Sequence, residues 1–438
     1  MSNPTQRQIL VIGAGMAGLA AARTLTAAGF DVLVLEGRQR LGGRIWTDRS
    51  FPGAVDLGAS WIESKQLNPL APLARRWKIP TSYTDFESTA LYDYDGRRLR
   101  ADRVAAVSKQ YERLMLDAQS QNLPAGVSVA DVLNRMLRRP GIDQQERRIW
   151  QWAMGAQASE YGADLADLSL NHFDEHYEME WDDYLVVGGY DRLVERMAAG
   201  LDVRLGQKVE RIEYEDRQVR VVLAAGETVS AERALVTLPL GVLQAGSVQF
   251  SPELPDWKLA AIARLAMGVV NKLVLGYPRR FWPAKPHFLG YAARDGNGEL
   301  AQIVNLAAAT GQNVLAIHFV GGRAKELEQE SDERAVAGAQ RILRIMFGAE
   351  IPEPDVVRVT RWGQDPFALG AYSYAPPGAS GENRDRLAAP LGERLFFAGE
   401  ATHRRFPSTA HGAYLSGVRE AERLQRPRSE VGVGNREP

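Results

Sequence analysis

The sequence has no cysteine and little lysine. Without cysteine the chain cannot form disulfides, thiolate metal sites or a catalytic thiol, and it cannot hold a cofactor through a cysteine thioether. Only 8 of its 53 basic residues are lysines. Because these 53 residues face 54 acidic ones, the net charge of −1 provides no general attraction to nucleic acid or to an anionic membrane. We therefore expect neither as a partner.

Long hydrophobic runs are also rare. Residues 9–30 are apolar enough to imitate a signal peptide, but their glycines and Arg23 favour a strand, a turn and a helix. Residues 423–438 are polar and offer no tail anchor. The six histidines are scattered, and the pair His172 and His176 matches no known ligand motif, so no metal site is expected. These patterns predict a soluble, cytoplasmic protein without a membrane anchor.

Both ends of the chain have the pattern of an α/β fold. Residues 8–12 and 31–36 are typical of buried strands, and residues 17–28 between them are typical of a helix. Further along we expect mainly helix at 122–195, a β meander at 202–238, a strand from Val269, a hairpin around 295–298, a helix at 332–347, a strand at 394–398 and a helix at 412–424.

A dinucleotide fingerprint follows the first strand. Gly13 permits a tight turn, Gly15 lets the backbone approach a pyrophosphate, and Gly18 lets helix and strand pack closely. The helix N-terminus then faces the phosphates with free N–H groups and the positive end of its dipole. Glu36 ends the next strand and can accept hydrogen bonds from ribose hydroxyls. The sequence therefore predicts a bound dinucleotide.

Further motifs point to the kind of dinucleotide and carry a family resemblance. Arg38, Gly42, Gly43 and Arg44 resemble the extended FAD motif of glutathione-reductase-like enzymes. The chain then contains, in this order, 58–63 (GASWIE), 237–243 (TLPLGVL), 361–362 (RW), 397–402 (FAGEAT) and 409–417 (TAHGAYLSG). This series resembles the flavin amine oxidase family, above all its polyamine and spermine oxidases and the oxidase core of histone lysine-specific demethylases.

The resemblance implies a fold and a division into domains. We expect an α/β FAD-binding domain of the glutathione-reductase-like, Rossmann type, with an inserted α+β substrate-binding domain. The FAD-binding domain is expected to comprise 1–78, 196–262 and 388–428. The substrate-binding domain is expected to comprise 79–195 and 263–387, and 429–438 form a polar tail.

The resemblance also implies which residues bind FAD. Ala371 stands where monoamine oxidases carry the cysteine that attaches the flavin, so noncovalent FAD is expected. A helix beginning near Ala410 would direct its positive end at the flavin, where negative charge develops on reduction. The expected cofactor-binding residues are Gly13, Gly15, Ala17, Gly18, Glu36, Arg38, Gly43, Arg44, Ser60, Trp61, Val209, Trp362, Gly399, Glu400, Thr409 and Ala410.

Two residues are expected to take part in the redox chemistry. Lys272 lies in an apolar strand pattern, where a lone lysine is usually an edge residue, but the resemblance implies that it holds a water beside flavin N5. Burial there would lower its pKa. Tyr372 matches one wall of the aromatic cage that flanks the substrate nitrogen, with a packed core tyrosine as the alternative. Thr409 replaces the second cage tyrosine, which favours a bulkier or substituted amine.

Carboxylates are the expected partners of a cationic substrate. Glu63 stands where plant polyamine oxidases carry glutamate and would pair with a distal ammonium group. A surface salt bridge is the other interpretation of Glu63. The acidic residues within 174–183 would attract polycations, although such runs are more often simply solvated. Trp61, Tyr372 and Thr409 complete the expected substrate site, and His411 is expected to be structural.

The resemblance implies an FAD-dependent amine oxidase that acts on a polyamine or another substituted amine. Hydride would pass from the carbon next to nitrogen to flavin N5, the imine would hydrolyse to an aldehyde or ketone plus an amine, and O2 would reoxidise the flavin and yield hydrogen peroxide. An L-amino-acid oxidase needs an arginine for the substrate carboxylate, and 45 arginines leave that alternative open. A non-catalytic flavoprotein that serves as a binding module is the third alternative. Because oxidase motifs occupy nearly the whole chain, a histone role is not expected.

Overall fold

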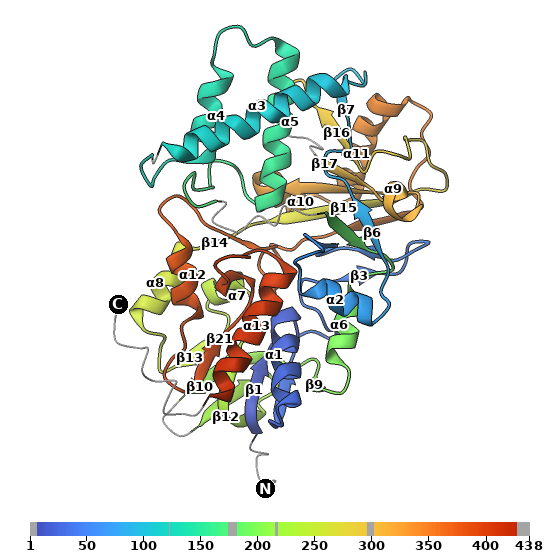
Figure 1. Ribbon diagram of the computed structural model, residues 1–438. Helices are drawn as coiled ribbons and strands as arrows, with labels where there is room; N and C mark the ends of the chain where they lie inside the picture. The colour runs from blue at the N-terminus through green and yellow to red at the C-terminus, as the bar shows by residue number, and fades with distance from the viewer. Residues whose placement is uncertain (1–6, 122, 174–181, 215–217, 296–301, 427–438) are drawn as a thin grey trace.

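Two large sheets, one above the other in Figure 1, organise the molecule. A computed structural model describes residues 7–121, 123–173, 182–214, 218–295 and 302–426. The first sheet, in the lower half of the view, combines strands from both ends and the middle of the chain. The second sheet, in the upper half, lies beside helices α3 (Ala101–Ser120), α4 (Val129–Leu137) and α5 (Gln144–Tyr161).

The first sheet is parallel around the glycine-rich turn. Within the described residues its strands are β1 (Arg7–Ile12), β2 (Val32–Leu35), β9 (Asp202–Arg204), β10 (Val209–Tyr214), β11 (Val219–Leu223), β12 (Thr228–Val236), β13 (Gln249–Ser251) and β21 (Leu395–Phe397). Strands β21, β12, β1, β2 and β9 pair in that order and all run parallel. Strands β10, β11 and β12 form the antiparallel meander that the alternating pattern predicted.

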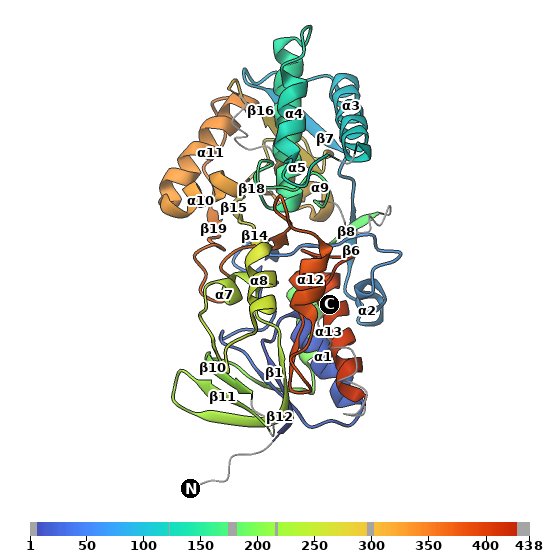
Figure 2. The same ribbon diagram turned by 90° about the vertical axis from the view of Figure 1, so that its left-hand side faces the viewer.

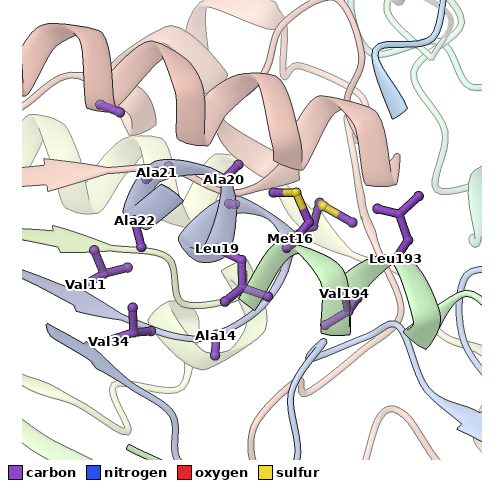
Figure 3. Close-up of a cluster of buried hydrophobic side chains, with 14 of the residues drawn as sticks. Val11, Ala14, Met16, Leu19, Ala20, Ala21, Ala22, Val34, Leu193 and Val194 are labelled. Carbon is purple, nitrogen blue, oxygen red and sulfur yellow. The ribbon is translucent and has the colours of Figure 1, made fainter. Parts of the chain in front are cut away.

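The side chains of β1 alternate between two cores because successive residues of a strand point to opposite faces. Ile9 and Val11 pack with α1 (Met16–Ala27), α2 (Leu70–Arg76), α6 (Asp191–Ala198) and α13 (Ala410–Gln425). Figure 3 shows Val11 in this core together with Leu19 of α1 and Val194 of α6. Leu10 and Ile12 face the meander and helices α7 (Leu240–Gln244), α8 (Asp256–Arg264) and α12 (Gly381–Ala388). Helices therefore cover both faces, as in a Rossmann-type α/β fold.

The second sheet is mostly antiparallel. Its order is β19 (Val356–Val359), β15 (Val270–Gly276), β18 (Val314–Val320), β17 (Gln302–Asn305), β16 (Phe288–Ala292) and β7 (Thr89–Asp93). Strand β15 confirms the strand expected from Val269, and β16 pairs antiparallel with β17. The expected hairpin turn at 295–298 falls mainly outside the described residues. Helices α9 (Leu306–Thr310), α10 (Gly321–Gln329) and α11 (Asp332–Phe347) complete this half, as Figure 2 shows.

Short strands connect the two halves. They are β3 (Thr47–Asp48) with β4 (Val55–Asp56), β5 (Trp61–Ile62) and β6 (Thr81–Thr84) on either side of β8 (Asp183–Val186), and β14 (Ala266–Met267) with β20 (Ser373–Tyr374). A 3-10 turn, η1 (Glu400–Thr402), precedes α13. Within the described residues, no helix has the length and apolarity that a membrane crossing requires, and no cluster of three or more potential ligands could hold a metal ion.

Candidate active site

A single cavity of about 1130 Å³ runs from the glycine-rich turn of the first sheet to β15 of the second. This volume exceeds the roughly 300–1,000 Å³ that suits a drug-sized ligand, so a dinucleotide and a substrate both have room. Every predicted site residue lines this cavity except Gly18. The structure therefore brings together residues that lie up to about 400 positions apart in the sequence.

The turn after β1 is shaped for close backbone approach. Gly13 has φ +110°, and a Cβ atom there would lie 2.5 Å from Oγ1 of Thr237. A Cβ atom on Gly18 would lie 1.9 Å from the carbonyl oxygen of Gly13, which explains why Gly18 packs helix against strand and does not reach the cavity. Helix α1 begins after Gly15, whose backbone alone caps it. Its first N–H groups therefore form a cradle that fits a pyrophosphate.

Glu36 and Arg38 form the wall next to this turn. Glu36 accepts hydrogen bonds from the backbone N–H groups of Ala14 (2.7 Å) and Arg38 (2.8 Å). The guanidinium of Arg38 donates two hydrogen bonds to Asp365, at 2.8 and 2.7 Å. These contacts hold the Glu36 carboxylate at the end of β2, where each of its oxygens keeps a further lone pair for a ribose hydroxyl.

Arg44 and Glu400 join the two ends of the chain inside the cavity wall. Arg44 Nη1 donates to Glu400 Oε1 at 2.8 Å and to the carbonyl oxygen of Ala371 at 2.9 Å. Glu400 Oε2 accepts from Ser373 Oγ (2.6 Å) and from the N–H of Ser408 (2.9 Å). Burial raises the pKa of Glu400, but the nearby Arg44 and these hydrogen bonds outweigh burial and leave the pKa below its usual value.

The remaining cofactor candidates lie around this ion pair. Trp362 donates from Nε1 to the carbonyl oxygen of Leu57 at 3.2 Å, and its ring meets that of Trp46 edge-to-face at 6.1 Å. Val209 begins β10 at the cavity wall. Thr409 caps α13, because its Oγ1 accepts from the N–H of Gly412 at 2.9 Å. The predicted helix start at Ala410 is therefore confirmed.

Lys272 is buried on an interior strand of the second sheet. Strand β15 lies between β18 and β19, so the interpretation of Lys272 as an edge residue is wrong. Its Nζ donates to the carbonyl oxygens of Asp56 (3.0 Å) and Gly58 (2.7 Å) and to Ser60 Oγ (2.8 Å). Burial lowers the pKa of Lys272, and the Asp56 carboxylate offsets part of that effect. The ammonium thus has protein acceptors where the sequence suggested a water.

Tyr372 and Trp61 are aromatic walls of the same cavity. Tyr372 donates from its hydroxyl to the carbonyl oxygen of Ser159 at 2.7 Å, which fixes the ring. Burial raises the pKa of this phenol, so it stays neutral at physiological pH. Trp61 donates from Nε1 to Thr84 Oγ1 at 3.1 Å. Both rings therefore have one polar anchor and an apolar surface on the cavity wall.

Glu63 lies beside the N-terminus of α13. Its Oε2 is 3.1 Å from Nδ1 of His411, within ion-pair distance, although the angles are not those of a hydrogen bond. The Glu63 side chain is 43% exposed, whereas that of His411 is 4% exposed. Burial, reinforced by the negative charge of Glu63, raises the pKa of Asp183 to about 6. Of the acidic run, residues 174–181 lie outside the described residues.

Sequence reasoning missed several residues of this site. Asp365 holds Arg38, Ser373 holds Glu400, and His411 lies against Glu63. His318 lies opposite Lys272 across strands β15 and β18 and also lines the cavity. His411 lies within the motif 409–417 and was expected to be structural, so only its contact with Glu63 was missed.

The parallel sheet, the glycine-rich turn and the cavity define a Rossmann-type dinucleotide-binding protein. Residues 16–425 match the family described as flavin containing amine oxidoreductase, and the chain belongs to this family. FAD is its cofactor, and the chain is an FAD-dependent amine oxidase.

Similar proteins come from plants. Polyamine oxidase 2 of Arabidopsis thaliana is 37% identical over 94% of this chain and 87% of its own length. Polyamine oxidase 4 of Oryza sativa subsp. japonica is 36% identical over 95% of this chain and 88% of its own length. Lysine-specific histone demethylase 1 homolog 2 of Oryza sativa subsp. japonica is 37% identical over 95% of this chain, but only 56% of its own length is covered.

Proposed function

We propose that this enzyme oxidises a polyamine or another substituted, multiply charged amine and yields hydrogen peroxide. The observation that carries the proposal is that Glu63, Lys272 and Tyr372 line the same cavity as the candidate FAD-binding residues. The names of the plant relatives in the comparison point to the same substrate class. A cytoplasmic location and the absence of a nucleic-acid partner stay predictions.

Each wall of the cavity has a proposed task. When bound, FAD would supply a hydride acceptor for the carbon next to the amine nitrogen and a route for the electrons to O2. The Tyr372 ring provides a flat apolar wall, and a neutral phenol adds no charge near the nitrogen. Because burial lowers its pKa, Lys272 can take up or release a proton near neutral pH. That exchange matters because the amine must be uncharged to lose a hydride.

Carboxylates on the walls suit a substrate with several positive charges. Glu63, Glu112, Glu160 and Asp183 all line the cavity. Basic side chains also line the cavity, so individual carboxylates, and not an overall negative charge, would pair with the ammonium groups. A charge-assisted hydrogen bond to Glu63 would fix the distal ammonium group, and His411 beside it would hold the carboxylate in place.

The arginines that line the cavity already donate to protein acceptors, which favours an amine over an amino acid as the substrate. Among the described residues, the arginines on the wall are Arg38, Arg44, Arg384 and Arg404. Arg38, Arg44 and Arg404 donate to Asp365, Glu400 and Asp385. Arg384 donates to Ser373 Oγ. A substrate carboxylate would have to compete with these acceptors, which weighs against an L-amino-acid oxidase.

We also propose that the second sheet and its surrounding helices form the substrate-binding domain. Lys272 on β15 and Glu160 on α5 line the cavity, and so does Tyr372, which comes directly before β20. The first sheet supplies the glycine-rich turn and Glu36. The proposed domain boundaries are those expected from the sequence except at α6 and α12, which pack on the first sheet and are therefore assigned to the FAD-binding domain.

The test is a substrate panel with hydrogen peroxide release as the readout. Purified holoenzyme is given putrescine, spermidine, spermine, their acetylated forms, tyramine and several L-amino acids. We expect the highest kcat/KM for an amine with at least two nitrogens. A higher kcat/KM for an L-amino acid would overturn the proposal in favour of an amino-acid oxidase, and no turnover of any compound would favour a non-catalytic module.

A further inference from the structure

His318 is a cavity residue to which the proposed function assigns no role. It pairs directly with Lys272 in the antiparallel register of β15 and β18, so the two side chains share one face of the sheet. Its ring meets Trp61 edge-to-face at 6.4 Å. It lines both the large cavity and a second, small cavity. A histidine in this place is within reach of the groups that surround the Lys272 ammonium.

Hydrogen bonds define the form of this imidazole. Nδ1 of His318 lies 3.1 Å from Oε1 of Gln302, and the same oxygen accepts from Ser159 Oγ at 2.9 Å. With the amide oxygen of Gln302 on this side, and the Ser159 hydroxyl donating to that oxygen rather than to Nδ1 at 3.5 Å, Nδ1 carries the proton and Nε2 presents a lone pair. Burial, followed by the charge of Lys272, lowers the pKa of His318 to about 3. The ring is therefore a neutral acceptor over the whole working range of pH.

The acceptor at Nε2 faces protein and not bulk solvent. Nε2 is shielded from bulk solvent and has no hydrogen-bond partner among the described residues. The small cavity beside His318 measures about 20 Å³, and Lys272, Ser60, Asp56 and Trp61 line it together with apolar side chains. A water molecule needs about 10–15 Å³ and polar partners, so this cavity has room for a single water that Ser60 and His318 would bind.

We propose that His318 is a positioning residue for Lys272 and acts through a chain of hydrogen bonds. Lys272 Nζ donates to Ser60 Oγ, and the Ser60 hydroxyl lies 3.2 Å from the carbonyl oxygen of Gly58, which already accepts from Lys272 at 2.7 Å. In the proposed chain this hydroxyl turns from Gly58 to a water in the small cavity, and the water donates to Nε2 of His318. Every proton in this chain points away from the ammonium. The hydrogen bonds of such a chain polarise one another. The chain therefore stabilises the charged form of Lys272 against the cost of its burial.

The inference rests on the role proposed for Lys272, and other groups act on the same site. The titratable groups around the pair are Asp56 on β4, Asp191 on α6, Tyr190 at the start of α6, and Glu63 and Glu160 on the walls of the large cavity. Asp56 raises the pKa of Lys272, and Asp191 raises that of Asp56. These groups remain in place when His318 is changed, so a shift reports on the chain itself.

The first test follows the pH dependence of flavin reduction in holoenzyme. The Lys272→Met variant identifies the ionisation that belongs to Lys272, because that step disappears in it. We expect His318→Leu to move the midpoint of this ionisation to lower pH by at least about half a unit, since the last acceptor is lost. His318→Gln keeps an acceptor near Nε2 and is expected to retain most of the wild-type midpoint. Equal midpoints in wild type and His318→Leu would overturn the proposal.

A second test does not depend on amine oxidation. In holoenzyme labelled with ¹⁵N-histidine, the His318 signals are those that vanish in His318→Gln. We expect a protonated Nδ1, a bare Nε2 and no titration between pH 8 and pH 5. A protonated Nε2, or a titration in that range, would overturn the proposal. If no amine is oxidised, the proposed function fails while this measurement still decides the state of His318.

Discussion

Two buried lysines make similar contacts in different places. Lys272 Nζ donates to two carbonyl oxygens and a hydroxyl beside the cavity. Lys258 Nζ donates to the carbonyl oxygens of Arg386 (3.0 Å), Leu387 (2.8 Å) and Ala389, and so caps the C-terminal end of α12. Lys258 is fully buried and does not line the cavity. Comparing variants at the two lysines therefore distinguishes the contribution of a buried lysine to stability from its contribution to catalysis.

Lys272→Met is expected to lower turnover by at least about tenfold, which corresponds to about 1.4 kcal/mol of barrier. FAD content and fold should survive, because methionine nearly conserves the volume of the side chain in an apolar strand. Rapid-mixing spectroscopy then shows whether flavin reduction or reoxidation by O2 is slowed. Wild-type rates for both half-reactions would remove Lys272 from the site.

Lys258→Met serves as the matched control. It leaves carbonyl oxygens of α12 without their donor, so we expect a loss of stability of about 1–3 kcal/mol. Turnover per bound FAD should stay at the wild-type level, since the residue lies away from the cavity. A parallel loss of turnover in both variants would mean that burial of a lysine, and not its place at the site, matters.

Glu63→Gln is expected to raise KM for polyamines by about tenfold and to leave the flavin spectrum unchanged. Loss of one charged hydrogen bond costs about 1.5–3 kcal/mol, and the partial exposure of Glu63 favours the lower end. KM for the monoamine tyramine should not change, because it has no distal ammonium. Glu350→Gln, on the exposed surface, is the control. An unchanged kcat/KM across amines of different length would return Glu63 to a surface role.

At the residue scale, the sequence predicts which residues of a motif line the site. It does not predict the distant residues that bind them. Gly13, Glu36, Arg44 and Lys272 lie on the cavity because each belongs to a local pattern that resembles a family motif. Asp365 could not be found in this way, because it is 327 positions away from Arg38. His318 was missed for the same reason: only strand pairing places it opposite Lys272.

At the scale of elements, the crossing of α1 and α13 shapes the cavity. A Cβ atom on Gly417 of α13 would lie 2.1 Å from the carbonyl oxygen of Ala17 in α1. Both atoms belong to helix backbones, so neither can yield without moving a helix. The close crossing sets the position of Thr409 and Ala410 at the start of α13.

Gly417→Ala is therefore expected to lower both stability and FAD retention. Overpacking of this kind typically costs about 1–3 kcal/mol. Gly338→Ala is the control, because Gly338 lies within α11 and an added Cβ atom would meet nothing within 4 Å. That change should be neutral or stabilise by up to about 1 kcal/mol. Thermal unfolding measures the stability, and the FAD content after gel filtration measures retention of the cofactor. A Gly417→Ala variant that equals wild type in both measurements would contradict the close crossing.

Most helices and strands with a clear hydrophobic periodicity were predictable from the sequence. Strands β1 and β2, helix α1, the meander and helix α11 all follow their sequence patterns. Strand β8 was not expected within the mainly helical stretch 122–195. Its Tyr184, Leu185 and Val186 form a strand because β5 and β6 pair with it on both sides. A four-residue strand of this kind depends on tertiary pairing and leaves little periodic signal.

At the scale of the whole molecule, FAD should be released intact on denaturation. No cysteine is present, and Ala371 occupies the position of covalent attachment in the monoamine oxidases that the sequence resembles. After acid precipitation we expect a colourless pellet and FAD in the supernatant, identified by chromatography. Flavin that stays with the pellet would contradict noncovalent binding.

Stability should also depend on pH through His403, whose pKa burial lowers to about 4, assisted by Arg419 and other nearby cations. The unfolded chain binds this proton at about pH 6.5, so stability falls as pH drops from 6.5 toward 4. His403→Asn keeps an acceptor for the N–H of Phe406 but does not titrate. Relative to wild type, the variant should gain about 1–2 kcal/mol between pH 7 and pH 5. Urea denaturation at both pH values measures this gain, and a constant difference would rule it out.

The order of the parallel strands has a consequence for biosynthesis. Strand β21 inserts beside β12, and α13 packs on α1, so residues 395–426 close a cavity that residues 13–44 open. On the ribosome, the first segment emerges long before the last one, because synthesis adds about 5–20 residues per second. A nascent chain therefore lacks Glu400 and the start of α13 until translation is nearly finished. FAD insertion is accordingly a late event, and a ribosome stalled before residue 395 would carry a chain that cannot retain the flavin.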